Sequence, residues 1–164
     1  GALLGWMTVA ENIALPLREN TKMTEGEISA HVEEALQLVG MAQDGNKLPN
    51  EISGGMQKRA GLARAIVRRP EIVLYDEPTS GLDPVTARAI DKLIRRLNEE
   101  LGITSVVVTH DLQGALLIAD RIAMLTGGRF VEVSAPKEFV ATEQPDVRRF
   151  LDAQFISKKG IEGM

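Results

Sequence analysis

Two adjacent carboxylates, Asp76 and Glu77, directly follow the short apolar run of residues 72–75. An aspartate at the end of a strand can bind Mg²⁺, because this ion prefers carboxylate and phosphate oxygens in an octahedral shell. The neighbouring Glu77 could orient or deprotonate an attacking water, which is worth roughly 10²–10⁴-fold in rate. An acidic pair before Pro78 is equally typical of a solvated turn, so the surrounding sequence has to decide between the two interpretations.

The segment Ser53-Gly54-Gly55 precedes a helical pattern that also contains Gln57. Glycines let the backbone approach a phosphate closely, and the start of a helix offers free N–H groups with roughly half a positive charge. Ser53 adds a hydroxyl donor. A flexible linker is the more common meaning of Ser-Gly-Gly alone, but here the turn leads directly into a helix and then to the acidic pair.

His110 ends a second apolar run, residues 105–109. Ligands of parallel α/β sheets bind beyond the carboxyl ends of the strands. If the two runs are neighbouring parallel strands, His110 is expected beside Asp76 and Glu77, within reach of a terminal phosphate. A lone histidine is more often structural, so this role depends on the acidic pair next to it.

The elements that must position these residues begin with a helical part. Capping-box spacing in Thr8-x-x-Glu11 and Thr24-x-x-Glu27 predicts two helices within the first forty residues or so. We expect Pro16 to end or kink the first of them. Gly40 is a candidate stop for the second.

After residue 49 the pattern alternates between helix and strand. The predicted elements are a helix over 56–69, a strand over 72–75, a helix from 83 to about 100, a strand over 105–109, a helix over 112–119, strands over 121–125 and 130–133, and helices over 136–141 and 145–153. This order predicts an α/β fold with parallel strands. The run at 72–75 is expected to be covered on both faces of the sheet, and the run at 105–109 is expected to be the next buried strand. Trp6 could belong to an exposed apolar contact patch or to ordinary helix packing.

Composition narrows the possible functions. The 164 residues carry a formal net charge of -4, which argues against a nucleic-acid partner bound through a broad basic surface. The absence of cysteine excludes disulfides and cysteine-based zinc sites. No run approaches the roughly eighteen apolar residues of a membrane span, and no signal peptide is recognised. We therefore expect a cytoplasmic protein that reaches a membrane only through a partner.

In combination, the segments resemble those of ABC ATPases. Residues 52–59 look like the signature motif, 72–77 like the Walker B strand, 80–83 like the D-loop and 109–111 like the switch-histidine loop. The resemblance implies a partial P-loop NTPase (RecA-like) core with a parallel sheet, joined to an ABC α-helical subdomain. The corresponding division is a helical subdomain over 1–69, the C-terminal part of the α/β core over 70–156, and a frayed tail over 157–164.

The same resemblance implies ATP and Mg²⁺ as cofactors. Glu77 would be the catalytic carboxylate, Asp76 would support Mg²⁺, and His110 would contact the γ-phosphate. The residues assigned to cofactor binding are Ser53, Gly54, Gly55, Gln57, Asp76 and Asp83. The serine–glycine segment would close over ATP bound to the opposite subunit of a homodimer, and Asp83 would lie across the dimer interface. Phosphoryl transfer depends mainly on positioning and charge stabilisation, which suits these residues.

A narrower resemblance rests on Met56 and on residues 7–17, MTVAENIALPL. Both look like the Mla-type ATPases, which move phospholipids between bacterial membranes. This implies a membrane permease and a lipid-binding component as further partners, and a peripheral position on the inner face of the plasma membrane. Two alternatives remain: the ATPase of an importer for a small solute, and a non-transport ABC ATPase. A non-transport ATPase would call for a long coiled-coil insertion or a basic face, and neither is visible.

One expected motif is missing. No G-x-x-x-x-G-K-[ST] phosphate loop occurs in the 164 residues, and neither the adenine-stacking aromatic residue nor the Q-loop glutamine is identified. We therefore expect that the part preceding Gly1 in such ATPases is absent from this chain. The chain by itself should then bind ATP weakly and be catalytically inactive. Loss of part of the sheet should also expose apolar strand edges.

Overall fold

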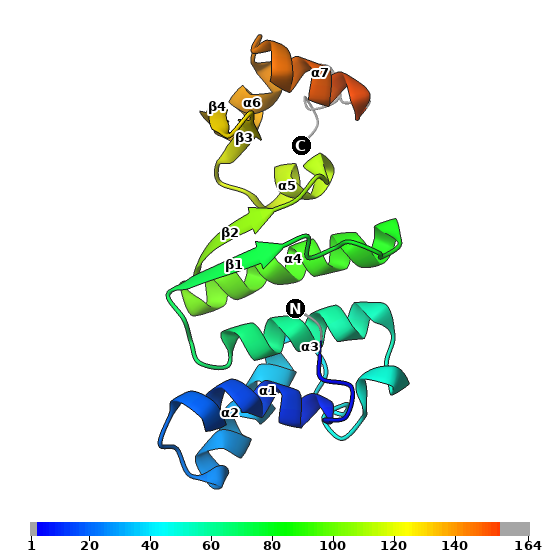
Figure 1. Cartoon of the computed structure of the whole chain (residues 1–164), viewed down its shortest axis with the longest axis vertical. Coiled ribbons are helices and arrows are strands. Elements are labelled where there is room, and N and C mark those ends of the chain that lie inside the picture. Colours follow the sequence, from blue (N-terminus) through cyan, green and yellow to red (C-terminus); the bar gives the residue numbers. More distant parts are fainter. Residues whose placement is uncertain (1–2, 155–164) are drawn as a thin grey trace. The chain divides into compact units, whose positions relative to one another are not determined.

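The computed structural model describes residues 3–154 and divides the chain into two compact units, residues 1–109 and 110–164 (Figure 1). The elements of the first unit are α1 (Val9–Asn20), α2 (Glu25–Leu38), the 3₁₀ helix η1 (Pro49–Glu51), α3 (Gly54–Ile66), β1 (Ile72–Asp76), α4 (Pro84–Leu101) and β2 (Thr104–Val108). The elements of the second unit are α5 (Leu112–Ile118), β3 (Ile122–Thr126), β4 (Arg129–Ser134), α6 (Pro136–Ala141) and α7 (Pro145–Ala153). The predicted tail over 157–164 lies outside the described residues. Within residues 3–154, no helix is long and apolar enough to cross a membrane.

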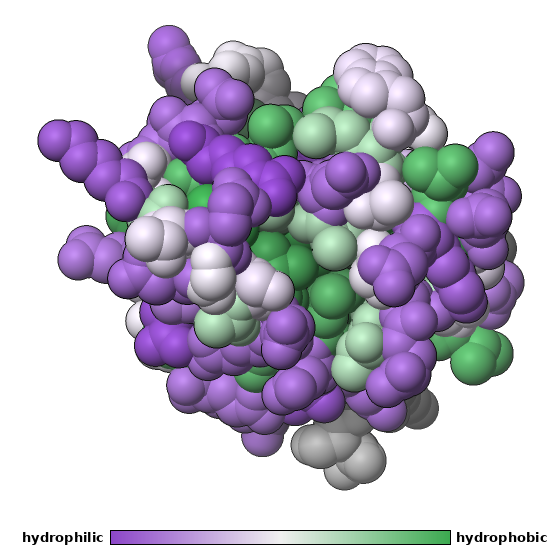
Figure 2. Space-filling model, turned by 90° about the horizontal axis from the view of Figure 1, so that it is seen from below, coloured by the Kyte–Doolittle hydropathy of each residue, from purple (hydrophilic) through white to green (hydrophobic). Residues whose placement is uncertain are grey.

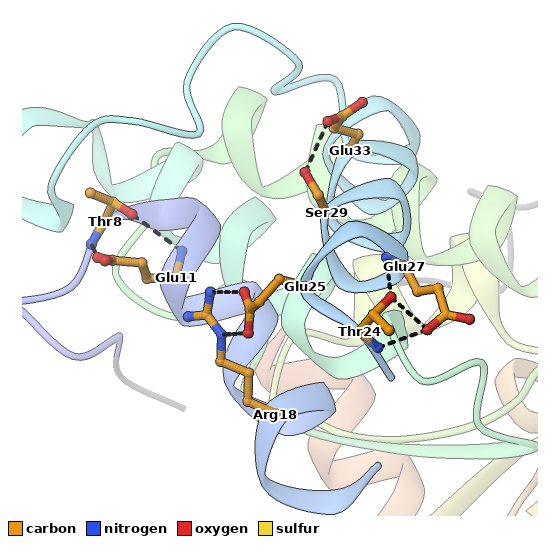
Figure 3. Close-up of polar contacts among 8 residues, drawn as sticks. All are labelled: Thr8, Glu11, Arg18, Thr24, Glu25, Glu27, Ser29 and Glu33. Atoms are coloured by element: carbon orange, nitrogen blue, oxygen red, sulfur yellow. Dashed lines mark hydrogen bonds and ion pairs between the residues drawn. The ribbon is translucent and has the colours of Figure 1, made fainter. Parts of the chain in front are cut away.

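Capping boxes begin α1 and α2, as the sequence predicts (Figure 3). The Thr8 hydroxyl accepts a hydrogen bond from the Glu11 N–H, and the Glu11 carboxylate accepts one from the Thr8 N–H at 2.7 Å. Thr24 and Glu27 repeat the arrangement, again with a 2.7 Å bond from backbone to carboxylate. Each box satisfies backbone N–H groups that the first turn of a helix leaves without an intrahelical partner.

A Schellman motif ends α2, which confirms Gly40 as the stop signal. Gly40 adopts a left-handed backbone with φ of 70°. Its N–H donates to the Gln37 carbonyl at 3.0 Å, and the Met41 N–H donates to the Leu36 carbonyl at 2.8 Å. Glycine reaches this conformation without the penalty that a Cβ would bring, so the helix ends here.

Pro16 does not end α1, which continues to Asn20. That half of the sequence prediction is wrong. Proline inside a helix costs about 3 kcal/mol, because it lacks an N–H and its ring meets the preceding turn. Contacts of α1 with α2 and α3 hold the helix together beyond the proline.

The bounds of α3 also differ from the prediction of 56–69. The helix begins at Gly54, because the Ser53 side chain caps it, and it ends at Ile66. Arg69 already has a left-handed backbone with φ of 50°. The residue before a proline is disfavoured in a helix, so the chain leaves the helix ahead of Pro70.

Helices α1, α2 and α3 pack against one another, and each buries one apolar face. The buried aliphatic residues of this cluster include Val9, Ile13, Leu17, Ile28, Val32, Leu36, Ala60, Ala63 and Ile66. Hydrophilic residues cover most of the molecule's lower face, with separate hydrophobic areas between them (Figure 2). This distribution is the one expected of amphipathic helices around a common core.

Asn12, on α1, is a fully buried polar residue in this cluster. Its Nδ2 donates to the carbonyls of Leu4, Met7 and Thr8 at 3.0, 3.1 and 3.0 Å. Its Oδ1 accepts from the Leu4 N–H at 2.7 Å and from Arg64 of α3 at 3.4 Å. These bonds fix residues 4–8 to the helical cluster. Trp6 lies in that fixed segment with 79% of its surface exposed, so it does not pack against the helices, and its role in an apolar contact patch stays a prediction.

Strands β1 and β2 pair in parallel, which confirms the predicted α/β arrangement. Val73 and Tyr75 of β1 are buried on one face of this sheet. On that face the Ser105 hydroxyl donates to Oδ1 of Asn98 at 2.6 Å, so α4 covers it. Desolvation in this layer raises the pKa of the Tyr75 hydroxyl.

The opposite face of the sheet is open. Ile72, Leu74, Val106 and Val108 are exposed by 61%, 76%, 51% and 60%. The predictions that the first strand is covered on both faces and that the second is buried are therefore wrong for the first unit as the structure describes it. The reason is that α4 lies on one side only, while the apolar strand composition is that of a sheet with two covered faces.

Up to residue 154, the second unit contains an antiparallel hairpin and three helices. Strands β3 and β4 are joined at Gly127 and Gly128, whose left-handed φ angles of 55° and 75° suit a tight turn. The helices α6 and α7 have the predicted bounds. The core of this unit consists of Leu112, Ile122, Phe139, Val140, Val147 and Leu151.

The buried amide of Asn12 should make a large contribution to the stability of the first unit. We expect Asn12→Ala to lower the free energy of unfolding by about 2–4 kcal/mol, because several backbone groups lose a partner in the interior. Urea unfolding followed by far-ultraviolet circular dichroism measures the effect on the helical cluster. Asn20→Ala, at the exposed end of the same helix, should change the stability by about 0.5 kcal/mol or less. An equal loss of unfolding free energy in Asn12→Ala and Asn20→Ala would contradict this role of Asn12.

Candidate functional site

The acidic pair lies where the sequence places it, at the carboxyl end of β1. Asp76 is the last residue of the strand, is exposed, and stands opposite Val108 of β2. Glu77 follows with a left-handed backbone, φ 46°. This conformation is uncommon for a residue with a side chain and costs of order 1–3 kcal/mol. Such residues cluster at functional sites, so the strain at Glu77 supports a role for it beyond capping a turn.

Backbone hydrogen bonds hold the Glu77 conformation in place. Its N–H donates to the Val108 carbonyl at 2.9 Å, which extends the pairing of β1 with β2 by one residue. Its carbonyl accepts from the Ser80 N–H at 3.2 Å. The following residues, Pro78 and Thr79, are buried. Glu77 is therefore the first residue of a well-anchored turn between the sheet and α4.

The serine–glycine turn (Ser53, Gly54, Gly55) forms the start of α3. The Ser53 hydroxyl accepts from the Met56 N–H at 3.3 Å and so caps the helix. Ser53 and Gly54 are exposed. The first N–H groups of a helix have no intrahelical partner and carry partial positive charge, which makes this end suitable for an anion.

Gln57 has a structural partner within the described chain. Its Nε2 donates to the Pro49 carbonyl at 2.8 Å, so its side chain ties η1 to α3. Gln57, which the sequence analysis assigns to cofactor binding, thus also connects η1 to the helix that begins at the serine–glycine turn.

The structure brings the serine–glycine turn against the start of α4. A Cβ on Gly55 would lie 2.7 Å from the Thr86 Cγ2, and one on Gly54 would lie 3.7 Å from Leu82. From the sequence, both glycines are predicted to let the backbone approach a phosphate closely. At Gly55 the structure adds a second requirement, because only hydrogen fits beside Thr86.

Asp83 caps α4 and belongs to the same contact. Its Oδ1 accepts from the N–H groups of Val85 and Thr86, both at 3.0 Å. The Thr86 hydroxyl, followed by the Thr86 N–H, lowers the pKa of this exposed carboxylate. The predicted site residues Ser53, Gly54, Gly55 and Asp83 therefore come together in the first unit, near the start of both helices.

His110 is the first residue of the second unit, and its carbonyl accepts from Gln154 at 3.4 Å. Its expected position beside Asp76 and Glu77 stays a prediction. The adjacent Asp111 caps α5 by accepting from the Gly114 N–H at 3.1 Å.

Asp76 fits a magnesium site that is completed by phosphate. Within residues 3–154, no group of three or more His, Cys, Asp or Glu residues could hold a metal ion. Magnesium typically takes one or two protein carboxylates and fills its remaining positions with water and substrate phosphates. A single exposed aspartate at a strand end suits that chemistry and does not suit a zinc or calcium site built from protein ligands alone.

Two contact residues escaped the sequence analysis. Thr86 looks like an ordinary helix residue three positions after Asp83, and nothing near it in the sequence indicates that Gly55 packs on it. Asn12 stands within the amphipathic pattern of the first helix, where a polar residue is expected on the surface. In both cases the partner lies on another element or in a loop, so no local pattern could have revealed the role.

Comparison with known proteins gives a consistent family match. A family model described as ABC transporter matches residues 2–80. The probable ribonucleotide transport ATP-binding protein mkl of Mycobacterium leprae is 45% identical over 161 residues, covering 98% of this chain and 46% of the relative. The intermembrane phospholipid transport system ATP-binding protein MlaF of Escherichia coli is 41% identical over 152 residues, covering 93% of this chain and 56% of the relative.

A further relative is the methionine import ATP-binding protein MetN of Xanthomonas campestris, 42% identical over 150 residues, with 91% of this chain and 44% of the relative covered. The chain thus spans about half the length of these curated relatives. Their names differ in the transported substrate and agree on an ATP-binding protein of a transport system.

Two solved structures match the fold. The dimeric ATP-binding cassette MJ0796, in a post-hydrolysis state bound to ADP and Pi, has a TM-score of 0.70 and 36% identity, with 82% of this chain and 59% of that chain covered. The protein cbiO1 from Clostridium perfringens, part of the transporter complex cbiONQ, has a TM-score of 0.78 and 32% identity, with 93% of this chain and 59% of that chain covered.

A single methyl group at position 55 should disturb the site. We expect Gly55→Ala to destabilise the first unit by about 1–3 kcal/mol through overlap with Thr86. That cost exceeds the gain of at most about 1 kcal/mol from placing alanine in a helix. Gly54→Ala is the matched control and should be close to neutral. Thr86→Ser removes the Cγ2 methyl and keeps the hydroxyl, so it should restore most of the stability in a Gly55→Ala background. Urea unfolding of the four proteins measures this, and a loss that persists in the double variant would contradict the contact.

The cap at Asp83 should respond to acid. Because the folded pKa is lowered from an ordinary value of 3.8, the charged cap stabilises the chain fully above that value and loses its effect as the pH falls through the folded pKa. Asp83→Asn keeps a capping oxygen but removes the charge. The urea midpoint of the wild type should therefore exceed that of Asp83→Asn near neutral pH, and the difference should close in the acid range below 3.8. A difference in urea midpoint that does not depend on pH would exclude a contribution from the charge of the Asp83 carboxylate.

Proposed function

The chain belongs to the ABC transporter ATPases and has the α/β P-loop NTPase fold that its sequence predicts, and from this premise we propose that it acts within an ATP-hydrolysing subunit that powers transport. The observation that carries the proposal is the acidic strand end. Glu77 is held in a strained conformation directly after Asp76, at the edge of a parallel sheet where ligands of this fold class bind.

Glu77 is the proposed catalytic carboxylate. A carboxylate in this place accepts a proton from the attacking water while a bond forms between the water oxygen and the γ-phosphorus. The bond from the γ-phosphorus to the bridging oxygen breaks, and ADP is the leaving group. The backbone bonds to Val108 and Ser80 restrict the directions that the Glu77 side chain can take. Restricting a catalytic group in this way contributes to rate without any change in its basicity.

Asp76 is the proposed protein ligand of Mg²⁺. Its exposure at the strand end leaves the carboxylate accessible to an ion that is also bound by phosphate oxygens. When bound, Mg²⁺ neutralises charge that develops on the phosphates. His110 is proposed to contact the γ-phosphate through its imidazole.

The start of α3 is the proposed contact with nucleotide bound by a second subunit. Ser53 and Gly54 are exposed there, and the helix start favours an anion. Gln57 supports the same turn through Pro49. Asp83 lies at the start of the neighbouring helix, so a subunit that docks on the turn would also meet Asp83. A dimer bound to ADP and Pi among the structural neighbours supports this arrangement.

A permease is the proposed membrane partner, and it would place the subunit on the inner face of the plasma membrane. Trp6 is exposed on a segment that Asn12 holds rigidly, and rigid, exposed aromatic residues are favoured as anchors of interfaces. A lipid-binding component outside the membrane would complete the system.

Phospholipid is the proposed cargo. Met56 and residues 7–17 support it, together with the relative MlaF, which belongs to an intermembrane phospholipid transport system. The relatives MetN and mkl, named for methionine import and ribonucleotide transport, support a small polar solute instead. ATPase assays of the subunit with its permease in vesicles, with and without each cargo, would separate these functions.

Glu77→Gln tests the proposed hydrolysis. In the full-length protein, we expect the variant to bind MgATP, to form a persistent dimer, and to lose turnover by roughly 10²–10⁴-fold, because glutamine has similar shape but cannot accept the proton. Calorimetric titration measures binding and steady-state phosphate release measures turnover. A variant that hydrolyses ATP at the normal rate would remove Glu77 from the mechanism.

A further inference from the structure

One side chain joins the helix of the serine–glycine turn to the proposed catalytic residue within the same chain. Lys58 lies on α3 and is half-buried. Its Nζ donates to the backbone carbonyl of Glu77 at 3.3 Å, across 19 positions of sequence. Lys58 stands about one helical turn after Gly54, so this bond connects the first turn of α3 to the end of β1.

The bond reaches a peptide whose conformation needs support. Glu77 has a φ of 46°, which a residue with a side chain rarely adopts unless its surroundings determine it. Val108 holds the N–H of Glu77 from the sheet side at 2.9 Å. On the carbonyl side, Ser80 donates at 3.2 Å from within the same turn. Of these three hydrogen bonds to the Glu77 backbone, the one from Lys58 comes from α3, outside the sheet and the turn.

Fixing both ends of one residue fixes the direction of its side chain. The bonds to its N–H and to its carbonyl together restrict the φ and ψ angles of Glu77, and these angles set the direction of its Cα–Cβ bond relative to the strand. A displacement of about 1 Å in a reacting group can cost roughly 100-fold in rate. The lysine therefore lies where a small change in α3 alters the position of the carboxylate.

Packing makes α3 suitable for this role. Gly55 lies against Thr86 so closely that no methyl group fits between them. The Asp83 carboxylate accepts hydrogen bonds from the backbone N–H and the side chain of Thr86. The start of α3, the start of α4 and the Glu77 turn are thus connected by direct contacts. A displacement of the serine–glycine turn is expected to be transmitted to Glu77 instead of being absorbed in a loop.

We propose that Lys58 is a positioning residue for hydrolysis: it holds the Glu77 peptide in its left-handed conformation and thereby couples the serine–glycine turn to the carboxylate of its own chain. This inference depends on the proposed function of Glu77. It adds a route by which contact made at the turn on one subunit changes catalytic geometry in that same subunit.

Three variants of the full-length protein test the role. Lys58→Met removes the donor and keeps an unbranched side chain, and we expect it to lower kcat by about 10- to 100-fold while KM for ATP changes by about threefold or less. Lys58→Arg keeps a donor and should recover activity to within a few-fold of the wild type. Lys92→Met, on the exposed side of α4, is the matched control and should behave like the wild type.

Hydrogen exchange supplies a readout that does not depend on turnover. The Glu77 amide should exchange about tenfold faster in Lys58→Met, while the amide of Leu74 in the same strand stays within about twofold. A merely structural role would change both amides together or neither of them.

The outcomes separate the two proposals. If Glu77→Gln is inactive but Lys58→Met has normal kcat and unchanged exchange at Glu77, the inference about Lys58 is wrong and the proposed function stands. Equal losses of kcat in Lys58→Met and Lys58→Arg would also overturn the inference about Lys58, because a hydrogen-bond donor at this position would then make no difference. Normal turnover in Glu77→Gln would overturn the proposed function and, with it, the catalytic meaning of Lys58.

Discussion

At the start of α3, a methyl group in place of the Gly55 hydrogen would lie 2.7 Å from the methyl group of Thr86. This separation is well inside van der Waals contact, so the two helix starts can meet only when one of them lacks a side chain. The contact fixes the serine–glycine turn beside Asp83, and it brings Lys58 within reach of the Glu77 carbonyl. One close approach between two helices therefore places the serine–glycine turn beside the start of α4.

The strain at Glu77 has to be considered together with that packing. A left-handed backbone at a residue with a side chain persists only where neighbouring contacts determine it. The sheet supplies one contact through Val108, the turn supplies another through Ser80, and α3 supplies the third through Lys58. An acidic residue that caps a surface turn would not need such support. The convergence of three elements on one peptide is what an accurately placed catalytic carboxylate would require.

Buried polar groups define the helical part of the chain in a similar way. The cluster of α1, α2 and α3 is held by ordinary apolar packing, but Asn12 determines the path of residues 4–8 over it. A buried amide whose hydrogen bonds are satisfied imposes one arrangement, because each alternative leaves polar groups unpaired in the interior. As a result, Trp6 is exposed on a fixed support. Among the described residues of the first unit, the sheet face of Ile72, Leu74, Val106 and Val108 is also exposed and apolar.

The local structure could be predicted from the sequence, because caps, turns and periodicity depend on residues that are close along the chain. The capping boxes at Thr8 and Thr24, the stop at Gly40 and the order of helices and strands were predictable for that reason. The candidate site residues were also named from the sequence, since their types and order are a local pattern, and their roles stay predictions. The remaining features could not be predicted in this way: the open face of the sheet, the continuation of α1 through Pro16, and the contacts of Gly55, Asn12 and Lys58. Each of these depends on which atoms of distant residues meet, and packing at such short distances is not encoded in any local pattern.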